Sequence, residues 1–178
     1  MAEVTEVSAD VAGLVRQETD EYRGDNPRPL GGYVVVMAAY STLVVATVVV
    51  AAITGRRLPE QWRVLDLFMA AVGTHKLSRT VTKDAVTSPL RAPFTRYVGG
   101  GGPAEVNEQT RHGNQFRHSM GELLSCPFCL DMWVATGFAI GLIFAPRFTR
   151  LVAGTFTALA GADFLQLAYA MAQQSARG

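Results

Sequence analysis

The sequence is poor in cysteine and in charge. It has two cysteines and 17% charged residues among 178, against 49% hydrophobic residues. Two cysteines are too few for a disulfide framework, and a mean hydropathy of +0.18 excludes a disordered chain. A net charge of +1 without a basic domain argues against nucleic acid as a partner. The sequence also lacks a catalytic triad, paired catalytic carboxylates, a dinucleotide fingerprint and a His-Glu-x-x-His motif.

Long runs almost free of charge predict transmembrane helices. Tyr33 to Ile53 has 21 uncharged residues, enough at about 1.5 Å per residue to cross about 30 Å of hydrocarbon. Residues 128–145 carry only Asp131, and 151–172 carry only Asp163. Residues 62–81 are apolar at first and basic at the end, so they either span or lie at the interface, and we favour spanning. We therefore predict an all-α integral membrane bundle of four transmembrane helices, at about 33–53, 62–81, 128–145 and 151–172, without strands in the lipid.

The charged residues predict the orientation of these spans. Residues 1–32 form an acidic leader with seven acidic and three basic residues, and their pattern predicts a short amphipathic helix. This helix either binds a partner or packs against the basic connection of its own chain, and we favour the second interpretation. Residues 83–125 form the long connection, and 173–178 the tail. Eleven Lys and Arg lie on the side of both termini and the connection, against five on the other side. The positive-inside rule then predicts cytoplasmic termini and a cytoplasmic connection, in a bacterial cytoplasmic membrane.

The long connection contains two breaks and a set of basic residues. Its prolines make 88–94 a stiff, turn-rich segment, and the four glycines of 99–102 predict a flexible hinge. The basic side chains of the connection could bind an anionic ligand. The positive-inside rule by itself also explains their presence on the cytoplasmic side, and we favour this second interpretation. These basic residues are Arg91, Arg96, Arg111, Arg117, His112 and His118.

The two cysteines stand in Cys126-Pro127-Phe128-Cys129, a Cys-x-x-Cys spacing at the start of a predicted helix. Two thiols at this spacing can form a disulfide, as in glutaredoxin or in quinone-linked membrane thiol oxidases, with Cys126 attacking and Cys129 resolving. They can also bind a metal such as zinc if His112, His118 or a second subunit completes the site. The third interpretation, which we favour, is a structural helix start without a cofactor.

A second group of polar residues lies inside the predicted spans. If both helices start on the outer side, Asp163 and His75 each lie twelve residues, or about 18 Å, into the membrane. An isolated carboxylate at that depth is costly, so we expect Asp163 to pair with His75 or Lys76, or to be protonated. Such a pair is either a proton or ion relay or an interhelical bond, and we favour the bond.

Four motifs together resemble a known bacterial family. They are His75-Lys76-Leu77-Ser78-Arg79, Lys83-Asp84, Ser88 to Phe94, and Gly121 to Cys129 with Trp133. The chain is similar, from about Val64 to Tyr169, to small membrane proteins grouped as a domain of unknown function, some of them described as sporulation-associated. The resemblance implies a bacterial multi-pass membrane protein and no established reaction.

The features above predict a small non-enzymatic scaffold or accessory subunit of a membrane complex. Small residues at four-residue spacing favour packing with itself or with another membrane protein, besides the lipid bilayer. The alternative is a thiol-disulfide oxidoreductase that uses Cys126 and Cys129, and the third possibility is metal binding by the same cysteines.

Overall fold

The computed structural model describes residues 2–25, 28–111 and 113–177, with residues 2–12 as backbone only. In this part of the chain the structure is mostly helical, with seven α-helices and two short strands. In order they are α1 (Ala2–Arg23), α2 (Leu30–Ile53), α3 (Val64–Lys83), the 3-10 turn η1 (Ala85–Thr87), α4 (Ser88–Arg91), β1 (Thr95–Gly100), β2 (Val106–Thr110), α5 (Gln115–Ser125), α6 (Pro127–Phe144) and α7 (Pro146–Arg177).

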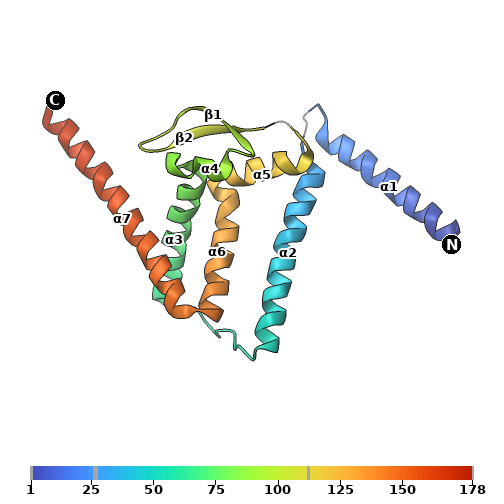
Figure 1. Ribbon diagram of the computed structural model, residues 1–178, viewed down its shortest axis with the longest axis horizontal. Helices are drawn as coiled ribbons and strands as arrows, with labels where there is room; N and C mark the ends of the chain where they lie inside the picture. The colour runs from blue at the N-terminus through green and yellow to red at the C-terminus, as the bar shows by residue number, and fades with distance from the viewer. Residues whose placement is uncertain (1, 26–27, 112, 178) are drawn as a thin grey trace.

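Four helices form a bundle with a cap across one end. Figure 1 shows α2, α3, α6 and the first half of α7 running up and down, while α4, the β1–β2 hairpin and α5 lie across the top. We call residues 84–125 the cap. The chain leaves the cap along α2, returns along α3, leaves again along α6 and returns along α7 (Figure 1). The α2–α3 connection and the α6–α7 turn therefore share the end opposite the cap.

Three of these helices, α2, α6 and α7, are long and apolar enough to cross a membrane. They contain 24, 18 and 32 residues, and 18 residues at about 1.5 Å each already cover about 27 Å. Few of their residues are buried inside the protein, so their apolar surfaces face outward. The fourth predicted span corresponds to α3, which is not among the three because it carries several charged residues, Asp66, Lys76, Arg79 and Lys83.

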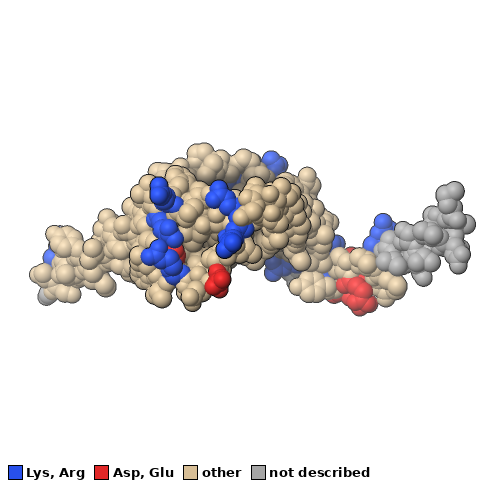
Figure 2. Space-filling view, turned by 90° about the horizontal axis from the view of Figure 1, so that it is seen from below, with Lys and Arg blue, Asp and Glu red and all other residues tan. Residues whose placement is uncertain are grey.

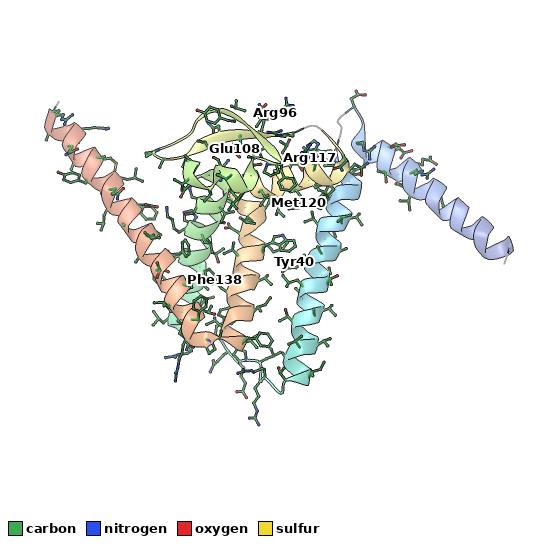
Figure 3. The ribbon with its side chains drawn as sticks, in the orientation of Figure 1. Tyr40, Arg96, Glu108, Arg117, Met120 and Phe138 are labelled. Atoms are coloured by element: carbon green, nitrogen blue, oxygen red, sulfur yellow. The ribbon has the colours of Figure 1, made fainter. Side chains whose placement is uncertain are left out.

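Helix α3 packs closely against α6 and α7. The apolar core between these helices consists of Ala70, Phe138 and Ala153, and Phe138 is labelled in Figure 3 between the ribbons of α6 and α7. A Cβ atom on Gly73 would lie 3.1 Å from the carbonyl oxygen of Ala153, so the glycine lets α7 approach. Helix α2 touches α6 through Tyr40, whose hydroxyl lies 2.9 Å from Thr136 Oγ1 and whose ring meets Trp133 edge-on.

The start of α2 packs against α5 in the cap. A Cβ atom on Gly32 would collide with Ser119 Oγ and with the carbonyl oxygen of Gln115, so only glycine permits this approach. Ser119 Oγ also donates to the carbonyl oxygen of Pro29 at 3.4 Å. Helix α2 begins at Leu30, so Gly31 and Gly32 lie inside it. These glycines allow α2 to pack closely against α5.

The cap contains a β-hairpin, which corrects the all-α prediction. Strands β1 and β2 pair antiparallel from Thr95 with Thr110 to Gly100 with Val106, and the register shifts between Tyr97 and Gly99. The glycine run predicted to be a hinge supplies the end of β1 and the turn, where the Gly101 amide donates to the Glu105 carbonyl oxygen at 2.8 Å. The strands satisfy each other's backbone groups outside the bundle, so the hairpin does not conflict with a helical membrane region.

Helix α1 is longer than the short helix predicted in the leader, and it leads away from the rest of the molecule (Figure 1). The described residues do not show α1 packed over the cap in Figure 1, and packing against the basic connection stays a prediction.

Arginines gather at the end of the bundle opposite the cap. Figure 2 shows Lys and Arg side chains grouped on the face seen from below. The two connections at this end contain Arg56, Arg57, Arg63 and Arg147, all exposed, and the first turns of α7 add Arg150. Arg150 donates twice to the Asp66 carboxylate, with both distances 2.8 Å, and so joins the start of α7 to the start of α3.

Replacing Gly121 by alanine is expected to lower the free energy of unfolding by about 1–3 kcal/mol. A Cβ atom there would lie 2.8 Å from the Phe94 carbonyl oxygen and 3.0 Å from Thr110 Cγ2, so α5 and the hairpin would have to separate. Thermal unfolding in detergent measures the change. Gly137→Ala is the matched control, because its Cβ meets nothing within 4 Å. Equal melting of the two variants would contradict the close packing of α5 on the hairpin.

Candidate thiol site

The cap, which ends next to the two cysteines, contains a buried ion pair between Arg91 and Glu108. Arg91 is fully buried, and its Nε and Nη2 donate to the two carboxylate oxygens of Glu108 at 2.8 and 3.0 Å. Arg91 also donates to the carbonyl oxygens of Val81 at 2.6 Å and Asp84 at 3.0 Å, and to Thr87 Oγ1 at 2.6 Å. The guanidinium therefore joins the end of α3, the α4 turn and strand β2.

Other basic residues of the connection also donate hydrogen bonds to backbone carbonyl oxygens of the cap. Arg111 Nε donates to the Thr95 carbonyl oxygen at 2.7 Å, and Arg117 Nε donates to that of Pro93 at 3.0 Å. Arg96, on β1, is exposed, and Figure 3 shows Arg96 and Arg117 in the cap. The sequence predicts these residues as charges that orient the spans. Arg91 acts differently, because a fully buried guanidinium adds no charge to the cap surface.

Glu108 gives the cap a pH-dependent stability. Its burial favours the neutral acid, but the hydrogen bonds from Arg91 and Thr95 outweigh this and hold the pKa of Glu108 below its ordinary value of 4.5. A lowered folded-state pKa stabilises the protein at every pH above the unfolded-state value, and this stabilisation is lost as the pH falls toward the folded-state value. We therefore expect the melting temperature to fall as the pH drops below about 4.5. Glu108→Gln should be less stable at neutral pH and should lose less on acidification, whereas parallel profiles would contradict this.

The thiol pair lies where α5 ends and α6 begins. Cys126 is both the C-cap of α5 and the N-cap of α6. Pro127 occupies the first position of α6, where a backbone amide would have no partner within the helix and its absence costs no hydrogen bond. The Cys129 amide donates to Cys126 Sγ at 3.3 Å, and Cys129 Sγ donates to Cys126 Sγ at 2.7 Å. Both cysteines are free, Cys129 exposed and Cys126 half-buried. Cys126 Sγ thus lies at the N-terminal end of α6, the end of a helix that favours negative charge.

Glu122, one turn before Cys126, ties this junction to α2. Its carboxylate accepts a short hydrogen bond from the Tyr33 hydroxyl, and it lies 3.6 Å from Arg28 Nη1 and 3.5 Å from His118 Nε2. Its carbonyl oxygen accepts from the Cys126 amide at 3.2 Å. Glu122 lies inside the motif Gly121 to Cys129, but nothing in its local sequence signals this role.

The predicted metal ligands are only partly covered by the structure. His112 lies outside the described residues. His118 is on α5 and faces Glu122, four residues on. Among the described residues no group of three or more His, Cys, Asp or Glu could hold a metal ion. Zinc binding by Cys126 and Cys129 therefore stays a prediction that needs ligands from elsewhere.

The polar residues predicted inside the spans lie where α3 meets α7. Lys76 Nζ is 2.7 Å from Asp163 Oδ2, and Thr157 Oγ1 donates to the Met69 carbonyl oxygen at 3.2 Å. His75 is exposed and lines the neighbouring cleft. Lys76 is therefore the partner that the structure gives to Asp163. A further bond, which the sequence analysis missed, joins α3 to α6, where the fully buried Ser78 donates to Asp131.

Residues 69–169, more than half of the chain, match the family described as protein of unknown function, DUF1360. The chain belongs to the DUF1360 family. No curated protein and no solved structure matches the chain. The DUF1360 match begins within α3 and ends within α7, so it includes the cap, the thiol pair and the Lys76–Asp163 pair. Helices α1 and α2 lie outside it, and Tyr33 thus brings a segment from outside the family match to Glu122.

Proposed function

We propose that this DUF1360 protein is a multi-pass protein of the bacterial cytoplasmic membrane, with α2, α3, α6 and α7 as its spans. The three apolar helices support this, because apolar surface facing outward needs lipid or a partner to cover it. Without the buried Arg91 and the Lys76 and Arg79 of α3, eight Lys and Arg still lie on the side of the cap and the termini, against five at the opposite end, which supports a cytoplasmic cap. Helix α7, at about 48 Å for 32 residues, exceeds the hydrocarbon thickness, which fits its slanted course in Figure 1.

Helix α3 fits this arrangement although its sequence is less apolar. Its charged residues within the bundle have partners on neighbouring elements. Asp66 bonds Arg150, Lys76 bonds Asp163, and Arg79 bonds Glu105 of the hairpin turn at 2.6 Å. Charged groups inside a membrane are tolerated when they face the bundle interior and pair with one another. Helix α3 therefore needs the neighbouring helices to pair its charges inside a membrane, whereas α2 has no charged residue.

We propose thiol–disulfide exchange as the chemistry of this protein, carried by Cys126 and Cys129. The observation that supports it is the 2.7 Å separation of the two sulfur atoms at the start of α6. A disulfide requires about 2.05 Å, so a small side-chain movement suffices to form the bond. On the cytoplasmic side a pair of this kind rests as a dithiol, and its substrate class is then a disulfide-bonded protein.

The exchange takes place in two steps. The Cys126 thiolate attacks one sulfur of the substrate disulfide, forming a mixed disulfide and releasing the other substrate sulfur as a thiolate. Cys129, after losing its proton, attacks Cys126 Sγ, which forms the Cys126–Cys129 disulfide and releases the second substrate thiolate. The substrate gains two electrons and two protons, and this pair loses them. A second cytoplasmic dithiol returns the pair to its starting state by the same exchange.

The assignment of Cys126 as the attacking thiol has a new basis. From sequence alone the assignment rests on the rule that the first cysteine of such pairs is usually the more exposed. Here Cys129 is the exposed one, and Cys126 is half-buried. The assignment instead follows from hydrogen bonding, since Cys126 Sγ accepts from both the amide and the thiol of Cys129. A sulfur that accepts two hydrogen bonds is the better thiolate.

The test uses the purified full chain in detergent with oxidised glutathione as the disulfide probe. Oxidation should remove two hydrogens from the parent protein. The oxidised protein should show a mobility shift in electrophoresis that dithiothreitol reverses. Cys129→Ser should accumulate a mixed disulfide with glutathione at Cys126, and Cys126→Ser should accumulate far less. Ser125→Ala is the control, because its hydroxyl donates to the Glu122 carbonyl oxygen at 3.4 Å and bonds nothing else in the part of the chain that the structure describes.

The same experiment separates exchange from the scaffold function predicted from sequence. A parent that stays a dithiol, or two cysteine variants that react alike, would rule out exchange by this pair. In that case the pair is a structural helix start, and Cys126→Ala should still purify with whatever membrane partners the parent retains. Under the exchange proposal, Cys126→Ala keeps its assembly and loses the reaction.

A further inference from the structure

A cleft of about 600 Å³ lies below the hairpin turn, between α3 and the upper part of α7. Its volume is within the range of about 300–1,000 Å³ found for ligand pockets. The cleft exists because α7 diverges from α3. The two helices touch at Gly73 and at Thr157, and beyond Lys76–Asp163 the hairpin turn lines the space that opens between them. Figure 1 shows α7 slanting away from α3 toward its C-terminal end.

The walls of the cleft differ in character. Helix α7 contributes an apolar wall of Ala160, Phe164, Leu167 and Ala170. Helix α3 and the hairpin turn contribute polar and charged residues, namely His75, Lys76, Arg79, Asp84 and Glu105. An apolar wall beside a polar one fits an amphiphile, whose chain and headgroup need different surroundings. The cleft is next to the cap, so in the proposed membrane it lies at the level of the headgroups.

The charges in the cleft favour a cationic headgroup. Both cations are already satisfied, because Lys76 is 2.7 Å from Asp163, and Arg79 donates to both carboxylate oxygens of Glu105 at 2.6 and 2.7 Å. Asp84 contributes a third carboxylate. Its backbone carbonyl oxygen accepts from Arg91, but its side chain has no hydrogen-bond or ion-pair partner in the described part of the chain. Among the Lys, Arg, Asp and Glu side chains that line the cleft, three carboxylates therefore face two cations.

We propose that this cleft binds an amphiphile that carries an ammonium group. The ammonium group compensates the unmatched carboxylate of Asp84, and the apolar chain lies along the α7 wall. Phosphatidylethanolamine is a membrane lipid with this chemistry, and a long-chain amine is a second source. The inference rests on the proposed membrane placement and is independent of the thiol pair, so Cys126→Ser should bind as the parent does.

The experiment measures lipid retention by native mass spectrometry of the full chain in detergent. Phosphatidylethanolamine, phosphatidylglycerol and dodecylamine are added separately. The parent should retain phosphatidylethanolamine in preference to phosphatidylglycerol, and Asp84→Asn should weaken this retention about fivefold. Ala170→Trp, which fills the cleft from an exposed position of α7, should abolish it without changing the melting temperature. Asp20→Asn on α1 is the charge-matched control and should bind like the parent.

Each result decides between sources or overturns the inference. Retention of phosphatidylethanolamine identifies a lipid, and retention of dodecylamine alone identifies a long-chain amine, both with loss in Asp84→Asn. Equal or stronger retention of phosphatidylglycerol overturns the cationic headgroup. Parent-like retention in both Asp84→Asn and Ala170→Trp shows that the lipid binds elsewhere, and retention of none of the three overturns the proposal.

Discussion

Arg91→Ala is expected to lower the free energy of unfolding by about 3–5 kcal/mol, the usual cost of removing one partner of a buried ion pair. The substitution leaves the Glu108 carboxylate buried without its cation, and it leaves the carbonyl oxygens of Val81 and Asp84 without their donor. For a chain of this size that loss lowers the melting temperature by about 10 °C or more. Thermal unfolding in detergent, followed by tryptophan fluorescence, measures it.

The controls separate the buried pair from a general effect of charge. Arg96→Ala removes an exposed arginine from the same cap and should melt with the parent. The double variant Arg91→Ala with Glu108→Gln should recover part of the loss, because the buried charge is then gone. Arg91→Ala that melts like Arg96→Ala would show that the pair does not hold the cap together.

Asp163→Ala is expected to destabilise the helical bundle by about 2 kcal/mol, and Asp163→Asn by less. Alanine leaves the Lys76 ammonium without its carboxylate 2.7 Å away, where the side chain of Lys76 is only 17% exposed. Asparagine keeps an oxygen that accepts a hydrogen bond from Lys76. Heating of the detergent-extracted variants, with the soluble fraction measured at each temperature, ranks them.

Asp20→Ala serves as the control for this series, because Asp20 is on α1 and its carboxylate is largely exposed. The parent and Asp20→Ala are expected to be equally stable and the most stable of the series. Asp163→Asn should be less stable than either, and Asp163→Ala the least stable. If both Asp163 variants melt with the parent, the Lys76–Asp163 bond contributes nothing to the contact of α3 with α7.

The helices of the bundle could be predicted because their signal is local. An uncharged run such as Tyr33 to Ile53 has few structural alternatives, and the structure has α2 at Leu30–Ile53. The partner of Asp163 could be narrowed only to His75 or Lys76, because both lie at the same depth. Neighbouring residues on a helix point about 100° apart, so the rotation of α3 decides between them, and tertiary packing sets that rotation.

The cap could not be predicted, because its structure depends on contacts between distant segments. Strand β1 contains Gly99 and Gly100, which weaken any strand signal, and it forms only through pairing with β2. Arg91 has the sequence pattern of a solvated basic residue. Its burial follows from Glu108, 17 positions later, which the hairpin brings to it. Nothing in the local sequence of either residue signals the pair.

The thiol site lies between these two cases. The spacing of Cys126 and Cys129 and the proline between them predicted two thiols at a helix start, and α6 begins at Pro127. The exposure of the two thiols was not predictable, since it depends on how α5 meets α6 and the start of α2. Glu122 and Tyr33 form that junction from positions 89 residues apart.

Thiol accessibility tests the proposed cytoplasmic exchange pair most directly. The two native cysteines are labelled with a membrane-impermeant maleimide in intact spheroplasts and in inverted vesicles, each with and without prior oxidation, reductant and chelator. We predict labelling only in inverted vesicles, loss of labelling after mild oxidation, and recovery with reductant. Labelling in intact spheroplasts would contradict a cytoplasmic cap, labelling unaffected by oxidation would contradict exchange, and labelling that requires a chelator would identify a metal site instead.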